Sequence, residues 1–274
     1  MCKLNGQDGM GSVLHLAPAN GFPPPTYRQL LEALSAHHRP LALLPRPLWP
    51  SSQPESAPDW HQLAADLVAG LDELALIGIA GVGHSLGGVL TLWAAIERPD
   101  LFRVVVLIDP VIFPPDLLEL MRAGNALGLA RRIPLVRAAL HRRRLFPDRQ
   151  ACFDHYRAKP LFERWSGSAL WDYVDGGTQV RLDGQLELLY PPEWEAHIFA
   201  TVPTDVWQGM ERLCVPALIL RGELSPTFRP AAMARMKRIL PAARFATIAG
   251  TGHLAPMERP AEVASAILDF SGSI

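Results

Sequence analysis

The sequence predicts an α/β fold in which a mostly parallel sheet is flanked by helices, and two observations carry that prediction. Short apolar runs rich in valine, isoleucine and leucine recur along the 274-residue chain. Segments with the apolar spacing of amphipathic helices separate these runs. Strands that crossover helices bury on both faces have this continuous apolar character.

Six apolar runs have the length and composition of strands in one main sheet. They occupy residues 12–18, 40–44, 76–82, 103–109, 216–221 and 244–248. About a dozen residues precede the first run. We therefore expect a sheet of roughly these six strands.

Two segments between the runs have apolar side chains at helical spacing. The apolar positions are Tyr27, Leu30, Leu31 and Leu34 in the first segment, and Trp60, Leu63, Ala64, Leu67, Val68 and Leu71 in the second. This i, i+3, i+4, i+7 pattern predicts amphipathic helices. Their apolar faces belong to the core rather than to a functional site.

A glycine-rich turn follows the third apolar run. Residues 83–87 read Gly-His-Ser-Leu-Gly, which fits the pattern G-x-S-x-G, and a helix-like segment begins at Gly88. A sharp strand-to-helix turn pushes its central serine out above the sheet, and the neighbouring residues must be small because the backbone passes close by. The same residues could form an ordinary turn with an incidental serine. Ser85 is nevertheless the candidate nucleophile.

A histidine in a glycine-flanked loop, His253, follows the last apolar run. A loop histidine just past a strand can point back over the edge of a sheet. Taken alone, it would more often be a solvated surface residue. Downstream of a serine turn, the chain order serine then histidine favours a catalytic base.

With a third motif, these features resemble the α/β-hydrolase superfamily over nearly the whole chain. The motif is Asn20-Gly21-Phe22-Pro23, which is similar to the family's H-G-F-P loop with Asn20 in place of the histidine. The resemblance implies an oxyanion hole formed by the backbone N–H groups of Phe22 and Leu86. Asn20 and Gly21 also suit an ordinary turn. Family members usually begin with an antiparallel hairpin, for which this chain has no room, so we expect the fold shortened at its N-terminus.

The carboxylate that should orient the histidine is missing from its usual place. The resemblance puts it just after the strand at 216–221, where the chain reads G-E-L-S-P-T from Gly222 and has no aspartate. Asp109, which ends the run 103–109, is the favoured substitute because some members of the superfamily carry their acid there. Glu223 is the second candidate, and a water-supported dyad is the third. An aspartate before proline is also a common strand-ending turn.

About a hundred residues between the fourth and fifth runs do not alternate cleanly. A structureless loop of that length would be improbable. We therefore expect a helical cap at residues 111–210 over a core domain formed by residues 1–110 and 211–274. Its aromatic side chains could line an apolar pocket or simply hold the cap together. They are Trp165, Trp171, Tyr173, Trp194, Phe199 and Trp207.

Composition argues against several other classes of function. The net charge of −1 gives no case for nucleic acid or an anionic membrane as the main partner. The three cysteines, Cys2, Cys152 and Cys214, form no zinc or disulfide pattern. No apolar run approaches the ~18 residues that a membrane span needs, and residues 1–10 lack an apolar signal region. We expect a cytoplasmic protein that acts on a small molecule without a metal or organic cofactor.

The resemblance implies a serine hydrolase that cleaves a carboxylic ester through an acyl-enzyme. Ser85 would be the nucleophile, His253 the base and Asp109 the orienting acid. Thioester hydrolysis, acyl transfer, C–C bond hydrolysis and cyanohydrin cleavage use nearly the same groups and stay open. A serine at this turn argues against dehalogenase and epoxide hydrolase chemistry, which uses aspartate there. A non-catalytic ligand-binding protein of this fold is the alternative from another class.

Overall fold

The computed structural model describes residues 11–272, and its main feature is a six-stranded parallel sheet. The strand order is β2-β1-β3-β4-β8-β9. The strands are β1 (Ser12–Ala17), β2 (His38–Leu41), β3 (Ile79–His84), β4 (Phe102–Ile108), β8 (Ala217–Gly222) and β9 (Arg244–Ile248). The predicted α/β fold with six main strands is confirmed in this part of the chain. The expected shortening at the N-terminus concerns residues 1–10, which lie outside the described residues.

Two strands differ from their predicted bounds for local reasons. β2 begins at His38, before its apolar run, and it includes Pro40. Because β2 lies at the edge of the sheet, beside β1 in the described part of the chain, the missing N–H of proline is tolerated there. β3 begins later than its run because Ile77 is exposed and Gly78 turns the chain with φ 61°.

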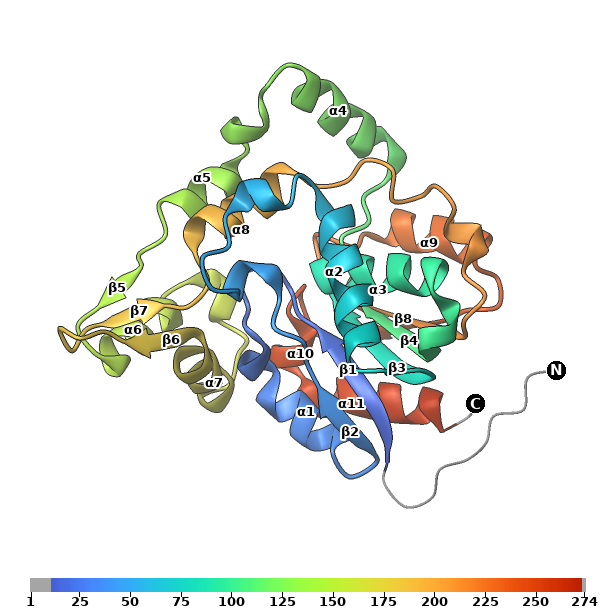
Figure 1. Ribbon diagram of the computed structural model, residues 1–274, viewed down its shortest axis with the longest axis horizontal. Coiled ribbons are helices and arrows are strands. Elements are labelled where there is room, and N and C mark those ends of the chain that lie inside the picture. Colours follow the sequence, from blue (N-terminus) through green and yellow to red (C-terminus); the bar gives the residue numbers. More distant parts are fainter. Residues whose placement is uncertain (1–10, 273–274) are drawn as a thin grey trace.

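Helices cover both faces of the sheet (Figure 1). One face packs against α1 (Arg28–Leu34) and α11 (Pro260–Ser271), and the other against α2 (Trp60–Glu73), α3 (Leu86–Glu97) and α9 (Pro230–Ile239). Strand side chains alternate between the two cores. In β4, Val104 and Val106 belong to the first core, whereas Val105 and Leu107 belong to the second. All four are buried, as a strand covered on both sides requires.

Helix α2 illustrates how the local sequence determines where a helix begins and which of its faces is buried. The side chain of Asp59 accepts hydrogen bonds from the N–H groups of His61 and Gln62, which caps the first turn. Trp60 and Leu71 mark the two ends of its buried apolar face. The predicted amphipathic helix is confirmed, and its face packs on α3 and on the sheet.

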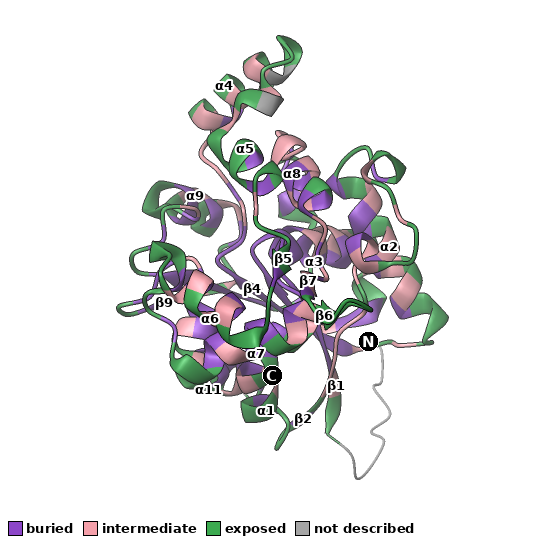
Figure 2. Cartoon of the chain, turned by 90° about the vertical axis from the view of Figure 1, so that its left-hand side faces the viewer, coloured by how far each residue is buried: buried purple, intermediate pink, exposed green. Residues whose placement is uncertain are grey.

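Between β4 and β8 the chain leaves the sheet and forms an inserted helical segment. Its helices are α4 (Pro115–Ala126), α5 (Pro134–Leu140), α6 (Arg149–Arg157), α7 (Gly167–Gly177) and α8 (Pro192–Ala200). Helix α4 stands at the periphery and is drawn mainly as exposed and intermediate, whereas the central strands β3, β4 and β8 of the main sheet are almost wholly buried (Figure 2).

The inserted segment also contains a small antiparallel sheet that the sequence did not predict. Its order is β5-β7-β6, formed by β5 (Leu145–Phe146), β6 (Thr178–Val180) and β7 (Leu186–Leu188). Strands of two or three residues are too short to show a period in the sequence. Their pairing depends on contacts between residues far apart in the chain.

Short helices complete the described chain. They are α10 (Ala255–Glu258) and the 3-10 turns Pro24–Tyr27, Arg46–Leu48, Pro54–Ser56, Pro99–Leu101, Ala130–Arg132, Pro160–Phe162 and Met210–Arg212. Among residues 11–272, no helix combines the length and apolar character needed to cross a bilayer.

Candidate active site

Ser85 occupies the sharp turn between β3 and α3, with φ 57° and ψ −115°. A positive φ is uncommon for a residue other than glycine, and such backbone strain gathers at functional sites. Two glycines make the turn possible. A Cβ on Gly83 would lie 2.2 Å from the carbonyl oxygen of Gly87, and a Cβ on Gly87 would lie 2.1 Å from that of Ala17. The predicted need for small neighbours therefore has a direct steric cause.

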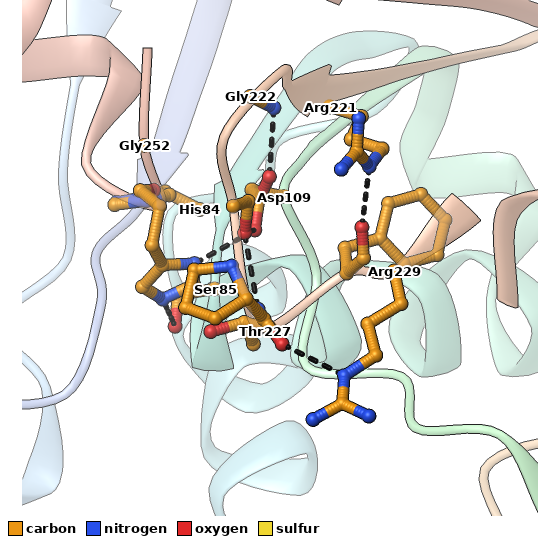
Figure 3. Close-up of polar contacts among 12 residues, drawn as sticks. His84, Ser85, Asp109, Arg221, Gly222, Thr227, Arg229 and Gly252 are labelled. Carbon is orange, nitrogen blue, oxygen red and sulfur yellow. Dashed lines mark hydrogen bonds and ion pairs between the residues drawn. The ribbon is translucent and has the colours of Figure 1, made fainter. Parts of the chain in front are cut away.

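His253 lies in the loop after β9 and contacts both of its predicted partners. Its Nε2 atom is 2.8 Å from Ser85 Oγ, and its Nδ1 atom is 2.7 Å from Asp109 Oδ1. The imidazole is about one-fifth exposed, whereas Asp109 is fully buried. The three side chains form one hydrogen-bonded row at the carboxyl ends of the parallel strands, where this fold class places its sites. Figure 3 labels the two ends of the row, Ser85 and Asp109.

Asp109 is held by three donors. Besides His253, its Oδ1 accepts the hydroxyl of Ser225 at 2.6 Å, and its Oδ2 accepts the N–H of Gly222 at 2.8 Å. A buried carboxylate needs such partners, because burial without them is costly. Ser225 was missed at the sequence level. It lies in the G-E-L-S stretch where the resemblance places the acid, and its hydroxyl instead donates to Asp109.

The loop after β8 is braced from behind by Arg221. Arg221 is labelled in Figure 3, and its buried guanidinium donates to the carbonyl oxygens of Phe228 at 2.7 Å and Glu223 at 3.0 Å. The loop also touches the histidine loop closely, since a Cβ on Gly222 would lie 1.9 Å from the carbonyl oxygen of Gly252. The groups that hold Asp109 are therefore fixed relative to the backbone beside His253.

The side chain of Glu223, the second candidate acid, binds the backbone of the histidine loop. Its carboxylate accepts the N–H of Gly250 at 2.8 Å. Glu258 does the same for the N–H of Gly252, at 2.7 Å. Within the described chain, Asp109 rather than Glu223 is the carboxylate hydrogen-bonded to His253.

A buried network behind the row was not predicted. The Nε2–H of His84 donates to the carbonyl oxygen of His253 at 2.8 Å, so its Nδ1 accepts the hydroxyl of Tyr27 at 2.7 Å. That hydroxyl accepts the N–H of Ala19 at 2.8 Å. Burial lowers the pKa of His84 to about 3 and keeps the ring neutral. The available signal was the place of His84 inside the G-x-S-x-G motif.

The two predicted oxyanion donors differ in their surroundings. Leu86 is the first residue of α3, where backbone N–H groups have no acceptor within the helix. The N–H of Phe22 instead donates to the carbonyl oxygen of Ala19 at 3.2 Å. This closes a turn in which Gly21 has φ 82°, a conformation that favours glycine. The Phe22 bond is at the long end of the usual range, so this donor is engaged only weakly.

Asn20 links this turn to the inserted segment. Its Nδ2 donates to the carbonyl oxygen of Glu195 at 3.0 Å, and its Oδ1 accepts the hydroxyl of Tyr190 at 2.9 Å. Asn20 is buried. The Asn20-Gly21 pair therefore does form a turn, and its role in an oxyanion-hole loop stays a prediction.

An ion pair and a group of aromatic rings lie over the same turn. Arg142 pairs with Glu195 at 2.5 Å and also donates to the hydroxyls of Tyr156 and Tyr173. The ring of Tyr173 packs against Phe22, with centroids 5.6 Å apart. Tyr156 and Tyr173 are buried against each other, which favours the structural role for the insert's aromatic side chains.

The cysteines stay apart from this site. Cys152 is a buried free thiol and Cys214 an exposed one, while Cys2 lies outside the described residues. Over residues 11–272, no group of three or more His, Cys, Asp or Glu side chains is arranged to hold a metal ion.

A serine on a strand-to-helix turn, with a histidine and an aspartate at neighbouring strand ends, is the arrangement typical of α/β hydrolases. Residues 13–266 match the model of the alpha/beta hydrolase family, and the chain belongs to that family. The resemblance seen in the sequence is confirmed.

Relatives within the family carry different activities in their names. The sn-1-specific diacylglycerol lipase of Mus musculus is 23% identical over 224 residues, which cover 77% of this chain but only 64% of the mouse protein. The 2-(acetamidomethylene)succinate hydrolase of Mesorhizobium japonicum is 28% identical over 224 residues, covering 80% of this chain and 73% of that protein. A crystal structure of E-2-(acetamidomethylene)succinate hydrolase has the same fold, with a TM-score of 0.79 at 24% identity over 96% of this chain and 92% of that one.

Proposed function

We propose that this protein is a serine hydrolase that cleaves a carboxylic ester of a small molecule through an acyl-enzyme. The observation that carries the proposal is the hydrogen-bonded row from Ser85 through His253 to Asp109, with distances of 2.8 Å and 2.7 Å. Both distances are within the range for a nucleophile, its base and the group that orients the base.

In the first half of the reaction, Ser85 Oγ attacks the ester carbonyl while His253 Nε2 takes the hydroxyl proton. Asp109 Oδ1 accepts the Nδ1–H of His253, which selects the tautomer with a free Nε2 and stabilises the imidazolium that forms. The carbonyl oxygen gains negative charge. The Leu86 N–H is the main donor to that oxygen, and the Phe22 N–H, shared with its turn, is the second.

Collapse of the tetrahedral intermediate breaks the bond to the alcohol. His253 returns its proton to the leaving alkoxide oxygen, and the acyl group stays on Ser85. In the second half, His253 takes a proton from water, whose oxygen attacks the acyl carbon. Release of the acid restores the Ser85 hydroxyl. This chemistry uses side chains, the two backbone N–H groups and water.

We also propose that residues 111–210 act as a cap over the core formed by residues 1–110 and 211–274. The contacts of Asn20 with Tyr190 and Glu195 support this division, because they join the inserted segment to the turn beside the nucleophile. A cap of this kind would select the acyl or alcohol portion of the ester. The relatives' names, a lipase and a succinate-derivative hydrolase, support hydrolysis and leave the acyl group open.

A series of p-nitrophenyl esters of increasing acyl length, combined with fluorophosphonate labelling, tests the proposal. The wild-type protein should turn over at least one ester and take up one fluorophosphonate label. Ser85→Ala should lose both, whereas Ser265→Ala, which removes an exposed hydroxyl on α11, should keep both. A folded wild-type protein that neither reacts with the probe nor cleaves any ester would overturn the proposal and favour a ligand-binding role.

A further inference from the structure

The inserted segment carries a strongly basic stretch, residues 120–145. The stretch contains seven arginines and no aspartate or glutamate. Asp116 and Glu119, early in α4, are the acidic residues that precede it. Because the whole chain has a net charge of −1, these seven positive charges leave the remainder of the chain at −8. The nearly neutral total therefore hides a local excess of positive charge.

Exposed leucines are concentrated in the same stretch. All six of its leucines are exposed, and they are six of the fourteen large apolar side chains that are exposed among the described residues. They are Leu120, Leu127, Leu129, Leu135, Leu140 and Leu145. Single exposed apolar side chains are normal on a protein surface, whereas a concentration of them marks an interaction site.

In and just after helix α4, two of these leucines lie on a face that the core does not use. Leu118 is buried in the core. The helical turns continue to Leu127, whose N–H donates to the carbonyl oxygen of Ala123 at 3.2 Å. Leu120 and Leu127 are seven residues apart and therefore share one face of these turns. Both views of the molecule place α4 at its outer edge (Figures 1 and 2).

Helix α5 leaves two further leucines outside its packed face. Val136 and Ala139 are buried against α8. Leu135 and Leu140, on either side of that contact, are exposed. The exposed leucines therefore extend from α4 through the connecting loop to α5.

Several arginines of the stretch carry charges that no carboxylate neutralises. Arg142 and Arg144 are paired with glutamates of α8. The exposed arginines that form no ion pair with a described residue are Arg122, Arg132, Arg137 and Arg143. A guanidinium group binds phosphate oxygens through two parallel N–H donors, so these side chains suit a surface rich in phosphate.

We propose that residues 120–145 dock this protein on the surface of an anionic lipid bilayer. The leucines enter the boundary between headgroups and acyl chains, and the unpaired arginines bind lipid phosphates. Leucines and arginines are interleaved over a helix, a loop and a second helix. A bilayer offers phosphate and hydrocarbon at different depths and adapts to this arrangement, whereas a folded acidic partner needs a surface of matching shape. Docking does not depend on the ester cleavage proposed above.

Cosedimentation with vesicles tests the proposal. The protein is mixed with vesicles of phosphatidylcholine alone, or of phosphatidylcholine and phosphatidylglycerol in a ratio of three to one. Binding to the anionic vesicles should be at least about tenfold tighter, since each arginine near the surface adds to the attraction. Raising NaCl from about 0.1 M to about 0.5 M should weaken it severalfold, because salt screens the charges. Equal binding to both kinds of vesicle, or none to the anionic kind, would overturn the proposal.

A pair of double variants tests the apolar contribution. Leu120→Ser with Leu127→Ser should weaken binding to the anionic vesicles by about tenfold or more. The matched control, Leu74→Ser with Ile77→Ser, changes two exposed apolar residues outside the inserted segment and should bind like the wild type. Equal losses in the two double variants would contradict the assignment to residues 120–145.

A second pair of double variants tests the charges. Arg132→Gln with Arg137→Gln should weaken binding to the anionic vesicles by about tenfold or more. Arg39→Gln with Arg238→Gln removes the same number of charges from exposed positions outside the inserted segment, and it should have little effect. If both pairs weaken binding equally, the attraction belongs to the whole surface and the proposal fails.

Hydrogen exchange on the wild-type protein covers the case in which a variant does not fold. Backbone N–H groups of residues 120–145 should exchange more slowly with the anionic vesicles, while those of residues 74–78 should not change. Protection of residues 120–145 by higher protein concentration but not by vesicles would assign the surface to a second copy of the chain. Protection by polyglutamate but not by vesicles would assign it to an acidic protein. Either result would overturn the proposal.

Discussion

The proposed catalytic row and the inserted segment are built by different kinds of contact. Around Ser85, backbone meets backbone so closely that Gly83, Gly87 and Gly222 leave no room for a Cβ. In the inserted segment, side chains make the contacts to the core, as Tyr190 does with Asn20. The first arrangement allows almost no substitution, whereas the second can change residue by residue. Under the proposed function, the chemistry would belong to the end of the sheet and selection of the substrate would belong to the insert.

The largest effect should come from the nucleophile itself. Ser85→Ala should lower kcat for the best ester by about 10⁴-fold or more, because no other group forms the covalent bond. His253→Ala should cost nearly as much. The double variant should be no slower than the singles, since the two residues act as one unit. Steady-state kinetics check this, with circular dichroism as the control for folding. A double variant much slower than either single variant would contradict the prediction that Ser85 and His253 act as one unit.

The acid should come next. Asp109→Asn should lower kcat by about 10²–10⁴-fold with little change in KM, because the tautomer of His253 matters mainly in the transition state. Glu223→Gln is the matched control. It keeps an oxygen for the N–H of Gly250 and should stay within about tenfold of the wild type. A severe loss in Glu223→Gln together with a mild one in Asp109→Asn would reverse the assignment.

Two glycine substitutions test the difference in packing directly. Gly222→Ala should lower the free energy of unfolding by about 3 kcal/mol, the upper end for overpacking, because its Cβ would lie 1.9 Å from a backbone oxygen. Gly124→Ala lies within helix α4 of the insert, where an added Cβ meets nothing within 4 Å. It should raise that free energy by up to about 1 kcal/mol through helix propensity. Urea denaturation measures the free energy of unfolding of both variants. Similar changes in the two would contradict the proposed difference in packing between the site and the insert.

The smallest effect concerns the dependence of stability on pH. Burial lowers the folded-state pKa of His15 to about 4 and that of His84 to about 3, below the unfolded value of about 6.5. The unfolded chain then binds more protons, so the free energy of unfolding falls as pH falls below about 6.5. From pH 6.5 to 5.5 each ring should contribute a loss of about 1 kcal/mol.

His15→Gln should remove one of these contributions and so reduce the loss of stability between pH 6.5 and 5.5 by about 1 kcal/mol. Denaturation at a series of pH values measures the slope. A slope that is the same in the variant and the wild type would show that His15 becomes protonated while still folded.

The residues that were predictable from the sequence carry their signal locally. Ser85 lies in a five-residue motif between a strand and a helix, and Asp109 ends an apolar run, so local pattern was enough to place each at a strand end. Ser225, Tyr27 and His84 act through partners far along the chain, and nothing in their neighbours marks those partners. The small sheet in the insert was missed for a similar reason, since its strands are defined by pairing rather than by period.

The ring of His84 joins three loops that come from distant parts of the sequence. The ring donates directly to the carbonyl oxygen of His253, and it is linked to the N–H of Ala19 through the hydroxyl of Tyr27. A change at Tyr27 or His84 alone leaves a buried polar group of the other without its partner, and an apolar pair exchanged together would take away the partners of the Ala19 N–H and of the His253 carbonyl oxygen. We therefore expect Tyr27 and His84 to be retained together during evolution, because each residue limits the substitutions that the other tolerates.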